Sequence, residues 1–139
     1  MPTVYIVQEP SKRDEDSGYF VPKFDFRPAE EYGALEYVVP ATYVLNRRDP
    51  ETVLDLMRTR LARFSEDDYL VPVGPTFFIA WAAVLAARAC GGRLRLLVWQ
   101  REEHRYQVVT AQIYDDEDET DEELAAASRE LLGWEKENR

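Results

Sequence analysis

Residues 69–87 carry no charged side chain and predict a buried strand, a tight turn and a buried helix. The strand is Tyr69–Val73, the turn is Gly74-Pro75, and the helix Thr76–Cys90 is apolar almost all round. A second apolar strand, Arg93–Trp99, follows the helix. Strand, helix and strand at this spacing predict a parallel βαβ unit with a right-handed crossover. Because the helix has so little polar surface, we expect it to be covered on more than one side.

Three more segments extend the predicted sheet. Thr3–Gln8 and Ala34–Val39 are rich in β-branched and aromatic residues and predict core strands. Arg105–Tyr114 follows the strand Arg93–Trp99 after the short polar link Gln100–His104, which predicts an antiparallel hairpin. The expected fold class is therefore α/β, a single domain with a mixed sheet, a central parallel βαβ unit and a C-terminal β-hairpin.

A second core helix is predicted from Asp49 to about Phe64. Asp49 suits the N-cap and Pro50 suits the first helical position. The apolar residues of this segment recur at three- and four-residue spacing and predict one buried stripe. They are Val53, Leu54, Met57, Leu61 and Phe64. This helix would cross from the strand Ala34–Val39 to the strand Tyr69–Val73.

The stretch between the first two core strands has a mixed pattern. Glu9–Gly18 is polar and rich in turn formers, so we expect an exposed loop. Phe20–Phe26 alternates, but Pro22 limits it to an edge strand or an extended loop. Pro28–Tyr32 predicts one helical turn closed by Gly33. The aromatic residues of the first forty positions suit either core and edge packing or an exposed protein-binding patch. They are Tyr5, Tyr19, Phe20, Phe24, Phe26, Tyr32 and Tyr37.

The last 25 residues differ sharply in charge from the rest of the chain. Residues 115–139 hold 11 acidic and three basic residues, a net charge of −8, whereas residues 1–114 have a net charge of −2. The capping-box pattern at Thr120–Glu123 predicts a helix from about Asp121 to Leu132, ended by Gly133. We therefore expect residues 1–114 to form an α/β domain and residues 115–139 an acidic linker and C-terminal helix.

This distribution of charge restricts the classes of partner that we expect the protein to bind. A nearly neutral body argues against nucleic acid as a direct ligand, which would need clustered lysines and arginines. The acidic tail favours a protein partner, such as a basic nucleic-acid-binding host protein. Its helix has a weak apolar face that would also serve to pair two copies of the chain. The partner-binding candidates are Asp115, Asp116, Glu117, Asp118, Glu119, Leu124, Leu131 and Trp134.

The chain has 139 residues, a length that suits one domain with one core. We expect it to be cytoplasmic. Its 45% of hydrophobic residues can build that core without metal. Cys90 is the only cysteine, which leaves no disulfide framework or cysteine-based zinc site. The N-terminus lacks the pattern of a signal peptide. We expect no membrane span, because Pro72, Gly74 and Pro75 interrupt the uncharged stretch that approaches the required length.

The turn Gly74-Pro75-Thr76 is the one candidate ligand site. It joins the carboxyl end of a predicted strand to a helix N-terminus, where α/β proteins collect ligands and anions. However, Pro75 removes one amide and no glycine-rich phosphate motif is present, so a plain structural turn stays open. His104 is the only histidine and lies in a polar turn. We expect no metal, no cofactor and no catalytic residue, because no nucleophile or acid–base set has a recognisable pattern.

Several segments resemble a group of small α/β proteins from bacteriophages and bacteria. The likeness rests on VYIVQEP near the start, PAEEYG, and DDYLVPVGPTFFIAWAAVLAAR followed by GGRLRLLVWQREEHRYQVV. The shared features are the strand beginning Asp68–Leu70, the Gly74-Pro75 turn, the alanine-rich helix, and Trp99 ahead of Arg105-Tyr106. The likeness covers most of residues 3–114 and leaves out the acidic tail. It implies a compact α/β fold and a phage origin, and it implies no activity.

Three functional hypotheses follow. The first is a non-enzymatic, phage-encoded accessory factor that binds a host protein, such as an anti-defence target, through an acidic or aromatic surface. The second is a small-ligand or nucleotide-binding enzyme with its site at Gly74-Pro75-Thr76. The third is a structural or oligomerisation module built on the C-terminal helix.

Overall fold

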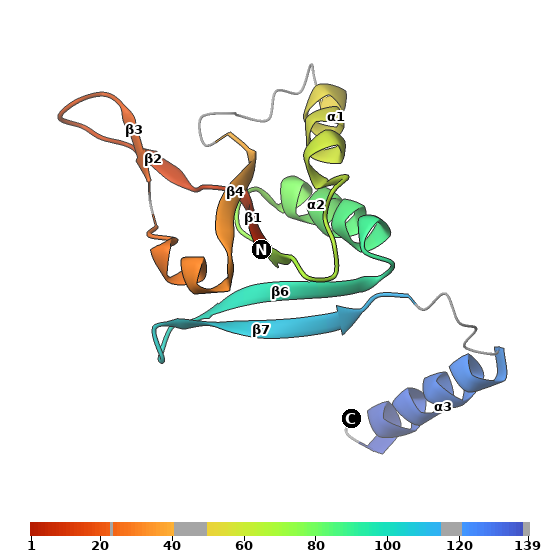
Figure 1. Ribbon diagram of the computed structural model, residues 1–139. Helices are drawn as coiled ribbons and strands as arrows, with labels where there is room; N and C mark the ends of the chain where they lie inside the picture. The colour runs from red at the N-terminus through yellow and green to blue at the C-terminus, as the bar shows by residue number, and fades with distance from the viewer. Residues whose placement is uncertain (23, 41–49, 115–120, 138–139) are drawn as a thin grey trace.

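A computed structural model describes residues 1–22, 24–40, 50–114 and 121–137 of the chain (Figure 1). Its main sheet has five strands in the order β4-β1-β5-β6-β7. The strands are β1 (Thr3–Gln8), β4 (Ala34–Val39), β5 (Tyr69–Val71), β6 (Arg93–Gln100) and β7 (Arg105–Gln112). The first four in this order are parallel, and β7 runs antiparallel to β6. The predicted fold class is confirmed, including the βαβ unit and the hairpin.

Two helices connect the parallel strands and lie side by side on one face of the sheet (Figure 1). Helix α1 (Pro50–Leu61) leads from β4 to β5, and helix α2 (Thr76–Ala89) leads from β5 to β6. The predicted second crossover is thus confirmed. Among the described elements, the one that packs on the opposite face is a short 3-10 helix, η1 (Arg27–Tyr32), which contacts β1, β4 and β7. In the described part of the chain, one face is therefore covered by full α-helices and the other by about two turns of 3-10 helix.

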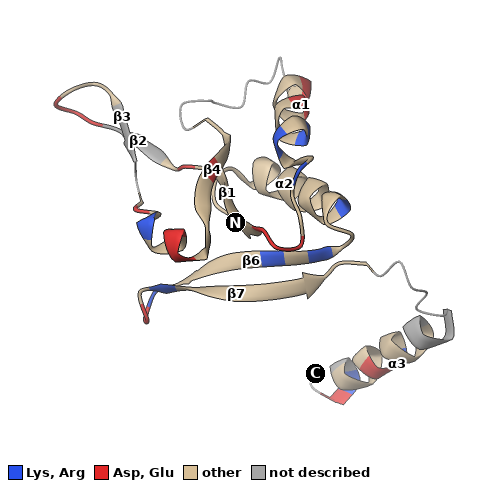
Figure 2. Cartoon of the chain, in the orientation of Figure 1, with Lys and Arg blue, Asp and Glu red and all other residues tan. Residues whose placement is uncertain are grey.

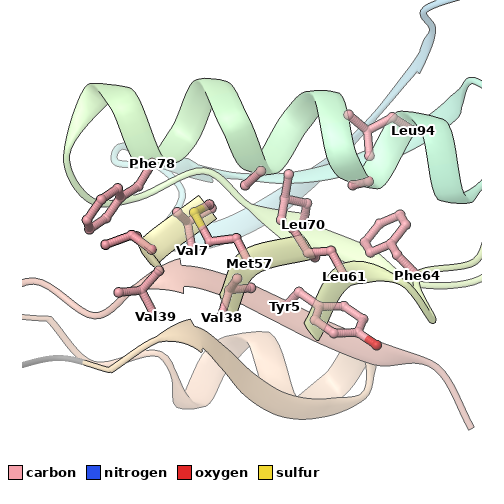
Figure 3. Packing of buried hydrophobic residues seen from close by; sticks show 13 residues of the cluster. Tyr5, Val7, Val38, Val39, Met57, Leu61, Phe64, Leu70, Phe78 and Leu94 are labelled. Carbon is pink, nitrogen blue, oxygen red and sulfur yellow. The ribbon is translucent and has the colours of Figure 1, made fainter. Parts of the chain in front are cut away.

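Each face of the sheet packs against its own hydrophobic core, and strand β1 contributes side chains to both. Tyr5 and Val7 point towards α1 and α2, whereas Val4 and Ile6 point towards η1, because successive side chains of a strand alternate between faces. The larger core lies on the helix side, where Phe64, Phe78 and Met57 are fully buried against the sheet (Figure 3). Burying side chains of this size removes enough apolar surface from water to hold the helices on the sheet.

The core on the other face is smaller and more aromatic. Buried Phe26 and Ala29 pack with Val71, Leu97 and Tyr106 from the sheet. Phe26 begins η1 and accepts a hydrogen bond from the backbone N–H of Ala29 at 2.9 Å. This face is closed only where η1 reaches, so the sheet beyond it meets solvent.

Three expected boundaries were wrong. The exposed loop predicted at Glu9–Gly18 contains strand β2 (Ser11–Arg13), which pairs antiparallel with β3 (Phe20–Pro22). Helix α1 ends at Leu61, and Phe64 is buried from the following turn. Helix α3 (Asp121–Glu137) runs through Gly133 instead of ending there. A glycine costs a helix only about 1 kcal/mol, so good helix formers on both sides carry the helix across it.

Helix α2 is covered on more than one side, as expected, but part of its surface meets solvent. Phe78, Ala82 and Ala86 face the core, but Phe77 is 63% exposed and Val84 is likewise exposed. Helix α1 and the strands β1 and β6 cover its other sides. None of the described helices combines the length and the hydropathy that a membrane span needs.

Asp68 ties the start of β1 to the start of β5. Its buried carboxylate accepts hydrogen bonds from the backbone N–H groups of Thr3 and Ser65, each at 2.8 Å, and from the Ser65 hydroxyl at 3.1 Å. Asp68→Ala is expected to lower the free energy of unfolding by about 2–3 kcal/mol, because it leaves these donors without an acceptor. Urea unfolding measures the change. The neighbouring Asp67→Ala is the control, since Asp67 is exposed and should change stability by less than about 0.5 kcal/mol.

Candidate functional site

A cavity of about 560 Å³ opens on the η1 face, where β5 and β6 reach their carboxyl ends. We call it the aromatic cleft. Its lining residues are Phe24, Asp25, Phe26, Pro28, Val71, Pro72, Val73, Leu97, Val98, Trp99, Arg101 and Tyr106. Its size lies in the range typical of small-molecule sites, roughly 300–1,000 Å³. The lining comes from three separate parts of the chain that only the fold brings together.

The β6–β7 hairpin supplies the most prominent wall. Trp99 and Tyr106 are directly opposite each other in the hairpin register, and opposed residues of an antiparallel pair share a face. Their ring centroids are 5.0 Å apart at an interplanar angle of 67°, the edge-to-face arrangement that aromatic pairs prefer. Tyr106 is buried, whereas Trp99 is 41% exposed. The pair therefore presents a supported indole ring to solvent.

The segment that leads into η1 supplies the opposite wall. Phe26 is buried in the smaller core, and Phe24 two residues earlier is 55% exposed. The Tyr32 hydroxyl donates to the Tyr106 carbonyl oxygen at 3.2 Å and so ties η1 to the hairpin. Phe24 and Phe26 also line a second, more polar cavity of about 450 Å³ with Glu9, Glu30 and Tyr37. Phe24, Asp25 and Phe26 thus line both cavities.

Two charged side chains, Asp25 and Arg101, line the cleft. Asp25 accepts hydrogen bonds from the Arg27 guanidinium at 2.9–3.1 Å, and these bonds lower the pKa of the Asp25 carboxyl below its usual value. Asp25 is the only carboxylate in the lining and is already paired, while Arg101 adds one positive charge. Burial raises the pKa of Tyr106, so its phenol is neutral at physiological pH. The cleft is therefore suited to binding apolar and aromatic groups.

The predicted site Gly74-Pro75-Thr76 lies at the same edge of the sheet but does not line the cleft. Gly74 has a φ of +124°, and a Cβ there would lie 3.2 Å from the Cβ of Gln8. The Gln8 backbone N–H donates to the Val73 carbonyl oxygen at 3.1 Å. Pro75 and Thr76 are exposed at the start of α2. The turn packs closely on the end of β1. The residues just before it in the sequence, Val71–Val73, line the aromatic cleft.

The other predicted candidates divide into two sets. Asp115, Asp116, Glu117, Asp118 and Glu119, together with the side chain of Leu124, lie outside the described residues. Leu131 and Trp134 are exposed on α3. No group of three or more potential metal ligands occurs in the part of the chain that the structure describes. His104 is exposed in the hairpin turn, and burial raises the pKa of the Cys90 thiol, which keeps it protonated at neutral pH.

The sequence did not single out the cleft. Trp99 and Tyr106 were noted only as part of a resemblance, and Phe24 and Phe26 only as members of an aromatic-rich segment. The predicted hairpin was the one sequence feature that indicated the Trp99–Tyr106 pair, because the link between its strands is short enough to place these residues opposite each other. Nothing in the sequence indicated that Phe24 would reach the same place.

Comparison with known proteins identifies one family. The family described as phage Pam3 gp32-like protein matches residues 2–113, which is most of the chain. The chain belongs to this family of phage proteins, and the matched range includes every residue of the aromatic cleft. The predicted resemblance to phage proteins is confirmed at that level. No curated protein and no solved structure matches the chain.

Proposed function

We propose that this member of the phage Pam3 gp32-like family is a protein-binding accessory factor that holds an apolar segment of a bacterial host protein in its aromatic cleft. The observation that carries the proposal is Trp99, a supported and half-exposed indole on the rim of an apolar cavity. Tryptophan, tyrosine and arginine are the residues that contribute most often to binding hot spots. The cleft combines Trp99, Tyr106 and Arg101.

Two exposed aromatic residues lie on the segment before η1. Phe24 lines the cleft, and Tyr19 in the turn before β3 also presents its ring to solvent. Exposed apolar surface beside a cavity marks sites of interaction. A partner with one apolar anchor for the cleft and a flanking apolar segment would fit this surface.

The acidic tail suits the same kind of partner. Its net charge of −8 would attract a basic host protein, and exposed Leu131 and Trp134 offer apolar contacts beside that charge. A nucleic-acid-binding defence protein is one such target. In this proposal the tail raises the rate of association and the cleft supplies the specific contact. A chain that ends at Tyr114 should then keep its partner but bind it more slowly and with less dependence on salt.

Phe24→Asp tests the role of the cleft. Because Phe24 is more than half exposed, the substitution should leave the fold intact while placing a charge on the cleft wall. Capture from bacterial host lysate by the tagged wild-type chain should recover a discrete partner, and the variant should recover at least about ten-fold less. Phe77→Asp is the matched control, an equally exposed phenylalanine on α2. Equal loss in both variants, or no loss in Phe24→Asp, contradicts the proposal.

The volume of the cavity supports a second candidate function, the binding of a small apolar or aromatic metabolite. A cleft of about 560 Å³ at the carboxyl ends of parallel strands is a common place for such ligands. A thermal-shift screen of nucleotides and aromatic metabolites distinguishes the two functions. A stabilising compound whose effect is lost in Phe24→Asp but kept in Gly74→Asp would place the ligand in the cleft. The reverse pattern would favour the Gly74-Pro75-Thr76 turn.

A further inference from the structure

The outer edge of β7 is open. This strand is the last of the sheet, and its eight residues pair one to one with β6 from Arg105↔Gln100 to Gln112↔Arg93. No described residue pairs with its other side. Alternate backbone N–H and C=O groups along about 25 Å of strand therefore have no partner strand. One of them, the Tyr106 carbonyl oxygen near the hairpin turn, accepts the hydrogen bond from the Tyr32 hydroxyl, and no described strand pairs with the edge from Val108 onwards.

The two edges of the sheet are protected very differently. Natural edge strands usually carry an inward or central charge, a proline or a bulge that discourages pairing with another chain. The opposite edge strand, β4, has Glu36 near its middle and Pro40 directly after it. In β7 the only charge is Arg105 at the first position, and the register with β6 is unbroken by a bulge. Figure 2 shows β7 free of charged residues beyond its start at the hairpin.

The centre of β7 is apolar on both faces. Val108 and Val109 point to opposite sides of the sheet and are 39% and 38% exposed. They are flanked by the uncharged residues Gln107 and Thr110. A strand laid along this edge would pair the open backbone groups and cover both valines, since β-branched residues pack well across antiparallel strands.

We propose that a second copy of the chain occupies this edge, with β7 paired antiparallel to β7 across a two-fold axis beside Val108 and Val109. The axis is perpendicular to the sheet, so each face continues into the same face of the second copy. Two five-stranded sheets then form one continuous sheet. The interface is isologous, the commonest arrangement in homodimers.

The position of the one charge favours a second copy in antiparallel orientation. With the axis at Val109, Tyr106 lies opposite Gln112 and Val108 lies opposite Thr110. The two Arg105 side chains are then about eight residues apart, or about 27 Å, well beyond the screening length of about 8 Å at physiological salt. Parallel in-register pairing would instead place like charges side by side. The strand is thus compatible with itself in the antiparallel orientation alone.

The molecular mass in solution tests this dimer, together with a variant that places a charge at the edge of β7. Sedimentation equilibrium of the wild-type chain should give twice the 16.2 kDa of one copy. Val109→Lys should raise the dissociation constant at least ten-fold with unchanged circular dichroism, because two lysines would meet at the axis. Val84→Lys on α2 and Leu131→Asp on α3 alter other exposed apolar residues and should leave the dimer intact. A monomeric wild-type chain, or a dimer lost only in Leu131→Asp, overturns the proposal.

Cysteine cross-linking tests the geometry independently of any loss of folding. In a Cys90→Ala background, a residue at the axis faces its own copy, so Val109→Cys should form a disulfide-linked dimer under mild oxidation, whereas Val108→Cys, which lies opposite Thr110, should form far less. Val84→Cys, which is more exposed, should not. Cross-linking that is equal at all three positions, or absent from Val109→Cys, contradicts pairing along this edge. The dimer is independent of the partner that the aromatic cleft binds, so either proposal can fail alone.

Discussion

Phe78→Ala is expected to lower the free energy of unfolding by about 3–5 kcal/mol. Phe78 projects from the first turn of α2 into the larger core and is completely buried (Figure 3). It belongs to the cluster that holds α1, α2 and the sheet together, near Val39 and Val7. Removing the ring loses its burial and leaves a cavity between layers that can relax only in part, because each layer is fixed by its own hydrogen bonds.

The neighbouring residue, Phe77, provides a control with the same side chain in an exposed position. Phe77→Ala removes an identical ring from the next position of the same helix, but this ring is 63% exposed. Its cost should be below about 0.5 kcal/mol. Urea unfolding followed by circular dichroism compares the two. If both variants lose similar stability, then the outer side of α2 is covered in solution and the described packing is incomplete.

Gly92→Ala is expected to cost about 3 kcal/mol or more. Gly92 joins α2 to β6 with a φ of +91°, a backbone conformation that side chains disfavour by about 1–2 kcal/mol. A Cβ there would also overlap the backbone carbonyl oxygen of Tyr114, which follows β7. The Gly92 carbonyl oxygen accepts a hydrogen bond from the Ile113 backbone N–H at 2.7 Å. The added methyl group would push the end of the hairpin away from the helix.

Gly91→Ala distinguishes the two causes of the lost stability, backbone strain and the overlap of the added Cβ with Tyr114. Its φ is +72°, but a Cβ there meets no atom within 4 Å. Gly91→Ala should therefore cost only the backbone strain, about 1 kcal/mol. Thermal and urea unfolding of both variants give the difference. Equal losses at the two positions would show that the close approach of Tyr114 to Gly92 does not occur.

The success of the sequence predictions depended on how much apolar surface each element buries. The five strands of the main sheet and the helices α1 and α2 have long apolar patterns, and each was identified close to its observed bounds. Strand β2 has the sequence Ser-Lys-Arg, which carries no such pattern and is set by its pairing with β3. The exposed side of α2 could not be predicted either, because composition gives no indication that the sheet and α1 cover only part of the helix.

The predicted site Gly74-Pro75-Thr76 lies at the same edge of the sheet as the aromatic cleft, but its residues do not line the cleft. Ligands collect at the carboxyl ends of parallel strands, and this rule pointed to Gly74-Pro75-Thr76. The connection from β1 to β4 contains β2, β3 and η1, and of these the short η1 packs on this face, where a full helix would cover more of it. The space left uncovered lies beside Val71 and Leu97, and Phe24 and Trp99 line it. Contacts between segments so far apart in the sequence follow from topology, which local patterns do not encode.

Site-specific photo-cross-linking in bacterial host cells tests most directly whether the aromatic cleft binds a protein. A photoreactive phenylalanine analogue would replace Phe24 on the cleft wall in one chain and Phe77 on α2 in another, two positions of similar exposure. We predict discrete protein adducts from position 24 that Trp99→Ala abolishes, and none of these adducts from position 77. Adducts at position 77 alone, or none at position 24, would contradict a protein-binding role for the cleft.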